Sequence, residues 1–450
     1  MKKIIFIFLL AYSAYSAAGQ SKHLRVPDAG VSGATVERVV RALASDKLQG
    51  RASGTPGGQK AADILVSEFE RIGLQPLPGL KGFAQTFPAY ESRTVALFMS
   101  LNNVPVPKEK LVLISHAAHL NWSEEDEGAP RVLVIGPQDK PQQHLRDILL
   151  PRENLVVLLD PAHQADFRRL VVRVRRGSLR YDKEGNPYST VVALSKVPET
   201  TTASGKIKFQ VAANTAPRTV ELRNVVGVLP GRNPARAAEQ VIFSAHYDHI
   251  GVLPPVQGDS IANGADDDAS GTTGVVALAE YFKKRNNNAR TLVFVAFVAE
   301  EIGGFGSRYF AQHLDPKQVV AMFNIEMIGK QAKFGPNTAF ITGFDKSNFG
   351  PLLQATLKGT LFSFEPDPYP EQNLFYRSDN ATLARLGVPA HTISTDQIPT
   401  DKLYHSVDDE VDSLDLPNMT AVITAIGRSA AGIISGQQTP TRIAPDQVQP

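Results

Sequence analysis

The second half of the chain alternates two kinds of segment, and this alternation restricts the possible fold more than any other feature of the sequence. Strand-like runs rich in Val, Ile and Phe recur from Asn224 onward: NVVGVLPG, QVIFSA, TLVFVAFV, VVAMFNIE and VPAHTIS. Two further runs, GTTGVVALAEYFKKR and MTAVITAIGRSAAGIIS, have the apolar spacing of helices. Strands that alternate with helices form a largely parallel sheet that is buried on both faces. The sequence therefore predicts an α/β domain over residues 217–436.

The remainder of the chain divides by texture. Two amphipathic stretches in residues 20–81, VERVVRALASDKLQGR and GGQKAADILVSEFERIGLQP, predict N-terminal helices of the same domain, with a stop at Gly73. In residues 82–216, short β-like runs such as KLVLIS, RVLVIG, NLVVLLD and RLVVRVRR are separated by polar loops. We predict a separate, mostly β insert there. We expect the tail, residues 437–450, to be flexible.

A basic cluster lies inside the insert. Six arginines fall between Arg168 and Arg180, in FRRLVVRVRRGSLR. One interpretation is a docking face for acidic partners. Charge clusters are more often the solvated face of a surface element, and we interpret this one as a solvated strand face.

The first residues have the order of a secretory signal peptide. Lys2 and Lys3 form a basic region, an apolar region runs from Ile4 to Ala11, and small residues follow as far as Gly19. The apolar run is too short for a permanent membrane anchor. We predict that residues 1–19 are a signal peptide and that the protein is exported to the periplasm or the extracellular space. A buried N-terminal helix is the alternative.

The composition excludes several classes of function. Lys and Arg number 47 against 45 Asp and Glu, and the net charge of +2 gives no electrostatic argument for a nucleic-acid partner. The chain has no cysteine, which rules out disulfides, cysteine nucleophiles and thiolate zinc sites. Any metal must therefore be held by carboxylates and by some of the 10 histidines.

Polar side chains gather where the predicted strands end. The clusters are His246-Tyr247-Asp248-His249, Glu300-Glu301, Glu326, the Asp266-Asp267-Asp268 run before a helix, and His405 in DKLYHSVDDE. Each cluster alone is compatible with a helix cap or surface charge. Together they converge on one edge of the sheet, where unpaired charges are very unfavourable. A pair of divalent cations would neutralise them.

The residue types in these clusters suit zinc. Zinc takes histidine nitrogen and carboxylate oxygen, and two such ions about 3.5–4 Å apart can share one carboxylate and one water. A free carboxylate then accepts the proton of that water and passes it to the leaving amine. Glu300 and Glu301 suit this division, because consecutive side chains at a strand end point in different directions. The sequence contains no HExxH, GxSxG or P-loop motif, and no GxGxxG after a strand.

Four motifs carry a resemblance to a known family. AHYDH, NGADDDASGT, AEEIGGFGS and YHSVDDEVDSLD resemble the di-zinc aminopeptidases of the clan MH zinc peptidases, which includes bacterial leucyl aminopeptidases, glutamate carboxypeptidase II, transferrin receptor ectodomains and glutaminyl cyclases. The resemblance covers residues 224–436 and extends to the N-terminal helices. It implies a three-layer α/β/α zinc-peptidase domain with a mixed, largely parallel sheet. The insert occupies the place where many members carry a protease-associated domain.

The resemblance also implies roles for individual residues. The implied metal ligands for two zinc ions are His246, Asp267, Glu301, Glu326 and His405, and the implied catalytic residues are Glu300, Asp248 and Tyr404. Asp267 would bridge both ions and Glu300 would be the general base. Asp248 would orient the His246 ring, and Tyr404 would hydrogen-bond the developing oxyanion. A packed core tyrosine is an equal alternative for Tyr404. The Asp266–Asp267 peptide would be cis, as it often is in this family.

Two positions depart from the family pattern, and three histidines stay outside it. Glu326 stands where the family usually has Asp, and Ser378-Asp379-Asn380 stands where it has Ser-Asp-His. The extra methylene of Glu326 is expected to change or weaken the hold on one metal. We expect His249, His313 and His391 to be structural.

The sequence leaves alternatives open. The leading prediction is an exported aminopeptidase that acts on peptides with a free N-terminus. A single-zinc glutaminyl cyclase, a carboxypeptidase or dipeptidase of the same fold, and a non-catalytic binding ectodomain are the alternatives. Neither the residue preferred at the cleavage site nor the oligomeric state follows from the sequence.

Overall fold

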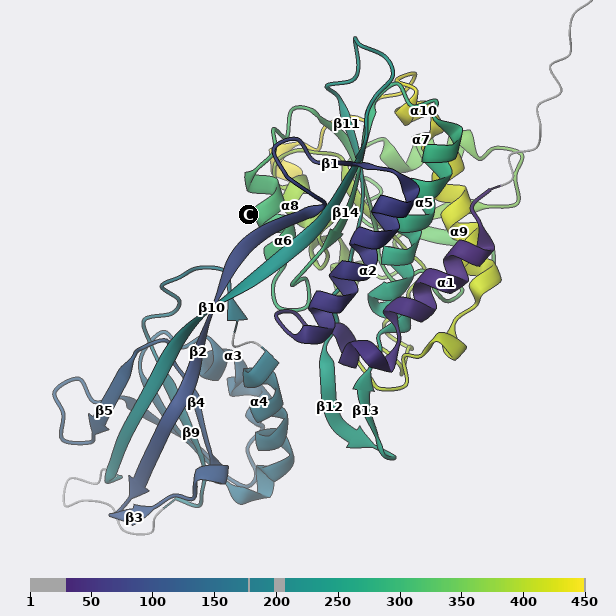
Figure 1. Cartoon of the computed structure of the whole chain (residues 1–450). Helices are drawn as coiled ribbons and strands as arrows, with labels where there is room; N and C mark the ends of the chain where they lie inside the picture. Colours follow the sequence, from purple (N-terminus) through teal and green to yellow (C-terminus); the bar gives the residue numbers. More distant parts are fainter. Residues whose placement is uncertain (1–29, 177–178, 198–206, 449–450) are drawn as a thin grey trace, which may run out of the picture.

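The computed structural model describes residues 30–176, 179–197 and 207–448, so the predicted signal peptide lies outside the described residues. Figure 1 shows two lobes joined by a pair of long strands, β2 (Ala84–Leu101) and β10 (Phe209–Leu229). These strands pair antiparallel along almost their whole length, from Phe209 opposite Leu101 to Val225 opposite Ala84. One end of the pair belongs to the insert and the other end to the central sheet of the main lobe.

The central sheet of the main lobe is mixed and largely parallel, as predicted. Its strand order is β17-β16-β18-β15-β11-β14-β10. The parallel pairs are β11 with β14, β11 with β15, β15 with β18 and β16 with β17, whereas β10 and β18 pair antiparallel with β14 and β16. The bounds are β11 Gln240–His246, β14 Thr291–Phe297, β15 Val319–Ile325, β16 Thr338–Ile341, β17 Ser363–Pro366 and β18 Ala390–Ser394.

Helices cover both faces of this sheet, and the three predicted layers are confirmed. One face carries α1 (Gly33–Leu43), α2 (Pro56–Ile72), α5 (Gly271–Arg285), α7 (Phe349–Thr356), α9 (Leu416–Ser429) and α10 (Ala431–Ile434). The other face carries α6 (Phe305–Gln312) and α8 (Asn380–Ala384). Helix α2 ends where predicted. Gly73 follows its last residue and caps it with a left-handed φ of 76°, which a glycine adopts readily.

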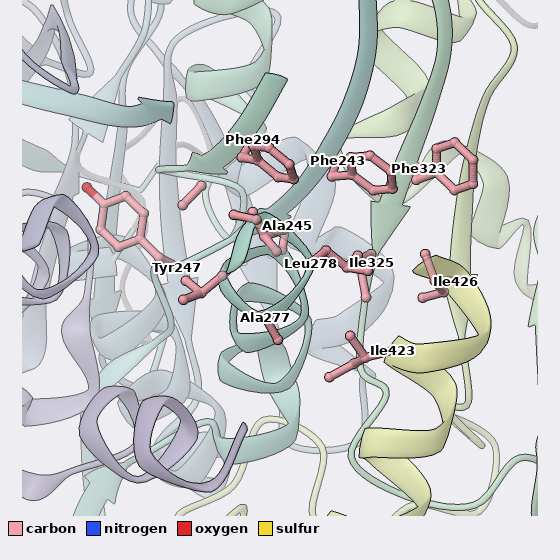
Figure 2. Close-up of a cluster of buried hydrophobic side chains, with 14 of the residues drawn as sticks. Phe243, Ala245, Tyr247, Ala277, Leu278, Phe294, Phe323, Ile325, Ile423 and Ile426 are labelled. Carbon is pink, nitrogen blue, oxygen red and sulfur yellow. The ribbon is translucent and has the colours of Figure 1, made fainter. Parts of the chain in front are cut away.

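Successive strand residues point to opposite faces and build two cores. Phe243 of β11 stacks on Phe294 and Phe323 of the neighbouring strands, at ring distances of 5.6 and 4.8 Å. Figure 2 shows these rings in a row facing α5 and α9. The preceding residue, Ile242, packs instead in the core under α6 and α8. Full burial of one such side chain stabilises the fold by about 1.5–3 kcal/mol, so both faces hold the strand ends in fixed register.

The insert has a sheet of its own, ordered β4-β9-β7-β6. β6, β7 and β9 are parallel, and β4 is antiparallel to β9. The elements of the insert are β4 Leu111–Ile114, β6 Arg131–Ile135, β7 Leu155–Leu159, β9 Thr190–Leu194, α3 Leu145–Leu149 and α4 Gln164–Arg176. The shorter strands elsewhere are β1 Gln75–Pro76, β3 Val104–Pro105, β5 His119–Ser123, β8 Leu179–Arg180, β12 Gly251–Val256 and β13 Asp259–Ala262.

The arginine-rich run is helical, so the prediction of a strand there is wrong. RLVVRVRR lies within α4, where Phe167, Leu170, Val171 and Val174 recur at helical spacing and pack on the insert's sheet. Arg168, Arg169 and Arg173 are exposed on the opposite side. The face is therefore solvated, but it belongs to a helix, and the insert mixes helices with strands more than the sequence suggests.

The C-terminal tail differs from the flexible segment that the sequence predicts. Ile443 is 2% exposed and packs in the core under α6 and α8. Arg442 donates to the carbonyl oxygen of Val319 at 2.8 Å, and Arg290 donates to that of Gln438 at 2.7 Å. These contacts fix the tail as far as Ile443. None of the helices in the described ranges is long and apolar enough to cross a membrane.

Candidate metal centre

The predicted polar clusters meet at the carboxyl ends of three adjacent parallel strands. His246 is the last residue of β11, Glu300 and Glu301 follow β14, and Glu326 follows β15. Asp267 lies in the turn that leads into α5. Because these strands are neighbours in the sheet, their ends deliver the side chains to one place.

One group of donors forms around His246. Its Nε2 lies 3.0 Å from Oε1 of Glu326 and 3.4 Å from Oδ1 of Asp267. The ring is 1% exposed, and its Nδ1 lies 3.0 Å from the backbone oxygen of Asp248. The carboxylate of Asp248 is 3.8 Å from the same nitrogen. The backbone of Asp248 orients the ring, whereas the sequence interpretation gave that role to the carboxylate.

A second group forms around Glu301. Its Oε2 lies 3.1 Å from Nε2 of His405, and its Oε1 lies 2.7 Å from Nδ1 of His249. Asp267 Oδ2 lies 3.2 Å from the His405 nitrogen and 3.7 Å from that of His249. The prediction that His249 is structural does not anticipate this placement. The signal was present, because His249 stands three residues after His246 in AHYDH.

Asp267 is common to both groups, since Oδ1 faces His246 and Oδ2 faces His405. Its neighbours in the triplet have another task. Asp268 accepts from the amide of Met327 at 2.9 Å, and Asp266 accepts from the amide of Gly329 at 2.8 Å, so both fix the chain after β15. The cis peptide is Asp267–Asp268, one bond later than the sequence interpretation placed it.

A buried arginine and a distant aspartate hold this turn, and sequence reasoning assigned neither of them. Arg51 is fully buried and donates to the backbone oxygens of Tyr247 at 2.7 Å, Gly264 at 2.6 Å and Asp267 at 3.0 Å. Asp409 accepts from the Asp267 amide at 3.1 Å. The N-terminal helical region and the C-terminal loop thus hold the backbone of Asp267 from two sides.

Residues 224–429 match the model of Peptidase family M28. This part of the chain belongs to that family. Leucine aminopeptidase 1 of Ajellomyces capsulatus is 30% identical over 212 residues, which cover 44% of this chain and 52% of that protein. Aminopeptidase YwaD of Bacillus subtilis is 30% identical over 110 residues, which cover 24% of this chain and 22% of that protein. The matches thus span about half or less of these relatives.

Solved structures share the fold of most of the chain. An aminopeptidase from Aneurinibacillus sp. strain AM-1 aligns with a TM-score of 0.55 and 18% identity, and the alignment covers 93% of this chain and 96% of that one. BSAP, a zinc aminopeptidase from Bacillus subtilis, aligns with a TM-score of 0.56 and 15% identity over 90% and 95% of the two chains. At this identity the likeness establishes the fold alone.

Opposing charges dominate the electrostatics of the M28 domain's donor groups. Burial alone would raise the pKa of Glu301, but His249 and His405 beside it hold that pKa at about 2. Burial would lower the pKa of His405, yet Asp267 and Glu301 raise it to about 10. The pKa of Glu300 is raised well above its ordinary range by burial and then by Glu326, although His246 opposes the rise.

The donor set fits divalent cations. Nδ1 of His249 and Oε1 of Glu301 are 2.7 Å apart, yet neither atom makes an aligned hydrogen bond. Two groups of donors have ligand atoms that lie within 4.8 Å of one another inside each group. One is His246 with Asp267 and Glu326, and the other is His249 with Asp267 and Glu301. Close imidazole and carboxylate atoms without hydrogen-bond alignment are the arrangement expected of ligands that point at a common ion.

Glu326 and Asn380, the two departures from the family pattern, both make hydrogen bonds in the structure. Glu326 Oε2 accepts from the Ser378 hydroxyl at 2.5 Å, so the longer side chain is anchored while Oε1 reaches His246. Asn380 is buried and donates to the backbone oxygen of Phe375 at 3.0 Å. His391 is buried, with Nε2 2.7 Å from the Ser347 hydroxyl and Nδ1 2.9 Å from the backbone oxygen of Thr342. Nδ1 of His313 lies 2.7 Å from the backbone oxygen of Tyr309.

A pocket opens beside the donor groups of the M28 domain. Its polar wall includes Asp267, Glu300, Glu301, Glu326 and His405. Phe340, Leu374 and Ile398 supply an apolar wall. Tyr404 also lines it, with its ring stacked 4.0 Å from the His405 ring, and burial raises the pKa of its hydroxyl. The pocket therefore joins an apolar surface to the candidate metal centre.

Proposed function

We propose that the protein is a two-zinc aminopeptidase that removes N-terminal residues from peptides by attack of water. The observation that carries the proposal is Asp267, whose two oxygens face two separate histidine and carboxylate groups. A shared carboxylate of this kind suits a pair of ions and has no use in a surface salt bridge. Peptidase family M28 supports peptides as the substrate class.

His405 is the proposed imidazole ligand of the second site, because its Nε2 lies 3.2 Å from Asp267 and 3.1 Å from Glu301, whereas Nδ1 of His249 lies 3.7 Å from Asp267. His246, Asp267 and Glu326 would hold one zinc ion, and Asp267, Glu301 and His405 would hold the other. His249 lies against Glu301 and would fix the orientation of that carboxylate. When bound, zinc supplies a Lewis acid that polarises the substrate carbonyl and makes water acidic at neutral pH.

Glu300 is the proposed general base. Its Oε2 lies 3.9 Å from Nε2 of His246, so it borders the donor groups and occupies neither one. It also lines the pocket in which the scissile bond would sit. Glu300 would take a proton from the attacking water and give it to the leaving amine. Tyr404 would donate its hydroxyl proton in a hydrogen bond to the developing oxyanion, because its raised pKa keeps it protonated.

Metal analysis and a substrate panel test this proposal together. Purified protein should contain close to two zinc ions and should hydrolyse aminoacyl nitroanilides but not their N-acetylated counterparts. A chelator should abolish the activity, and zinc should restore it. Near-zero metal after zinc loading would overturn the proposal. One ion with cyclisation of glutaminyl peptides would favour a glutaminyl cyclase, and release of C-terminal residues would favour a carboxypeptidase.

The proposed site of action is outside the cytoplasm, on the basis of the predicted signal peptide in residues 1–19. Expression with and without these residues, followed by fractionation, tests this. Retention of the full-length chain in the cytoplasm would contradict it.

A further inference from the structure

The pocket beside the metal centre contains a carboxylate that the proposed mechanism does not use. Asp396 follows β18, is 3% exposed and lines the pocket. Neither of its carboxylate oxygens has a hydrogen-bond partner. The Ile398 amide lies near enough to lower its pKa somewhat, but it does not align as a donor. Burial, Asp266 and Asp401 together raise that pKa to about 8.

No basic side chain in the described ranges forms an ion pair with Asp396. Lys330 is engaged by Asp401 at 2.5 Å and by Asp266 at 3.3 Å. Arg377 also lines the pocket, but it is exposed and donates weakly to Gln372 at 3.5 Å. A buried carboxylate without a partner is unfavourable unless a ligand completes it. Its position inside the pocket indicates that the ligand enters there.

The walls around Asp396 define the shape of that ligand. Phe340, Leu374 and Ile398 line the same pocket and belong to one apolar cluster. A long aliphatic stem would pack on these side chains, while a cationic end would reach the carboxylate. Lysine and arginine side chains have this form. A leucine side chain would fill the apolar part and leave the carboxylate buried and unpaired.

We infer that Asp396 selects substrates whose N-terminal residue is lysine or arginine, which rests on the proposed aminopeptidase function. The pocket continues from Glu300 and Glu326 to Asp396, so the side chain of a substrate held at the metal centre enters it. Asp396 is then a specificity-determining residue. A cationic side chain would favour the ionised form of Asp396, whereas N-terminal Asp or Glu would bring a further acidic group beside it and should be poor substrates.

The test compares kcat/KM for lysyl, arginyl, leucyl and glutamyl nitroanilides in zinc-loaded protein. Wild-type protein should prefer lysyl and arginyl over leucyl substrates, and Asp396→Asn should reduce that preference at least about tenfold. Turnover of the leucyl substrate should be retained. Asp396→Glu should keep most of the preference, because it keeps the charge. Asp408→Asn is the matched control, since it removes an exposed carboxylate three residues from His405, and it should change nothing.

The outcomes separate this inference from the proposed function. An equal loss on all substrates would mean that Asp396 binds the α-amine common to them and would overturn the inference. An unchanged lysyl-to-leucyl ratio in Asp396→Asn would overturn it too. If no substrate is hydrolysed, thermal stabilisation by free lysine and by free leucine gives a second measurement. Stabilisation by lysine that Asp396→Asn abolishes would support the pocket and count against the peptidase; equal stabilisation by both amino acids would overturn the pocket.

Discussion

The backbone amide of Glu300 donates a hydrogen bond of 3.2 Å to Oδ1 of Asp248. Asp248 lies two residues beyond β11, and Glu300 lies beyond β14, so one carboxylate connects two neighbouring strand ends. Its other oxygen accepts from the Ser53 hydroxyl at 2.8 Å. The Asp248 carboxylate therefore holds the loop that carries the proposed base and Glu301, while its backbone orients His246.

Replacement of Asp248 should separate these two tasks. Asp248→Ala removes both acceptors and should lower kcat by about tenfold or more, because the base is no longer positioned. Asp248→Asn should be milder, since its amide oxygen can accept from Glu300 and its NH₂ can donate to Ser53. Metal content should stay near wild type in both, because the backbone oxygen that orients His246 is retained. Equal loss of metal and rate would contradict this assignment.

The two adjacent glutamates should respond differently to the same substitution. Glu300→Gln should lower turnover at least about a hundredfold and keep both metals, because it removes basicity without removing a ligand. Glu301→Gln should lose metal as well as rate. Metal analysis and kinetics on both variants are the measurement. If Glu300→Gln loses metal and Glu301→Gln keeps it, the two roles are reversed; if both keep full activity, the peptidase proposal fails.

Substitution of Asp267 should cause the greatest loss of metal of any ligand substitution. Asp267→Asn should reduce affinity for both ions, because each oxygen of Asp267 faces one donor group. Glu326→Asp should weaken one ion only, since the shorter side chain no longer reaches His246 while Ser378 anchors it. Stepwise zinc titration after chelation resolves the two sites. Loss of both ions in Glu326→Asp, or of one ion in Asp267→Asn, would show that the groups are not arranged as proposed.

His249 should act through Glu301. Removal of the imidazole in His249→Ala frees one oxygen of Glu301 and should weaken the second ion by about 10- to 100-fold, the usual effect of losing a side chain that orients a ligand. The matched control is His313→Ala, which removes an exposed imidazole on α6's C-terminal side. Zinc affinity measured by competition with a chelator gives the result. Unchanged zinc affinity in His249→Ala would show that His249 does not orient a ligand and is purely structural.

Glu280 of α5 should make stability depend on pH at the acid end. It pairs with Arg71 at 2.8 Å, accepts from the Thr35 hydroxyl at 3.1 Å and is paired with Lys284, and so joins α5 to α1 and α2. Burial opposes ionisation, but Lys284 and Arg71 lower its pKa from 4.5 to about 2. The folded state therefore binds this proton less readily than the unfolded state. The stabilisation is full above about pH 4.5 and is lost as the pH falls towards 2.

Urea unfolding at several pH values checks this prediction. Glu280→Gln should lower the unfolding midpoint at pH 7, and the difference from wild type should shrink progressively below pH 4.5. Glu37→Gln, on the exposed face of α1, is the control and should change little. A difference that stays constant down to pH 2 would show that the Glu280 contacts do not depend on its charge.

Much of the M28 domain follows from local pattern. The strand runs of β11, β14, β15 and β18 and the helices α5 and α9 lie where the sequence predicts them. The strand prediction for RLVVRVRR is wrong because a short apolar and basic stretch fits both the helical and the strand period, and only its packing through Phe167 and Val174 selects the helix. The prediction of a flexible tail fails for a similar reason, since the composition of the tail does not reveal that Ile443 packs in the core.

Strand runs and polar clusters are local features of the chain, so the amino-acid order alone indicates which residue types stand at the strand ends and that they gather at one edge of the sheet. The specific contacts between them depend on the tertiary structure. It brought His249 against Glu301, placed Arg51 and Asp409 on either side of Asp267, and left Asp396 buried and unpaired in the pocket. These contacts join residues far apart in sequence, and their distances depend on how strands and helices pack. A one-dimensional pattern carries no information on that packing.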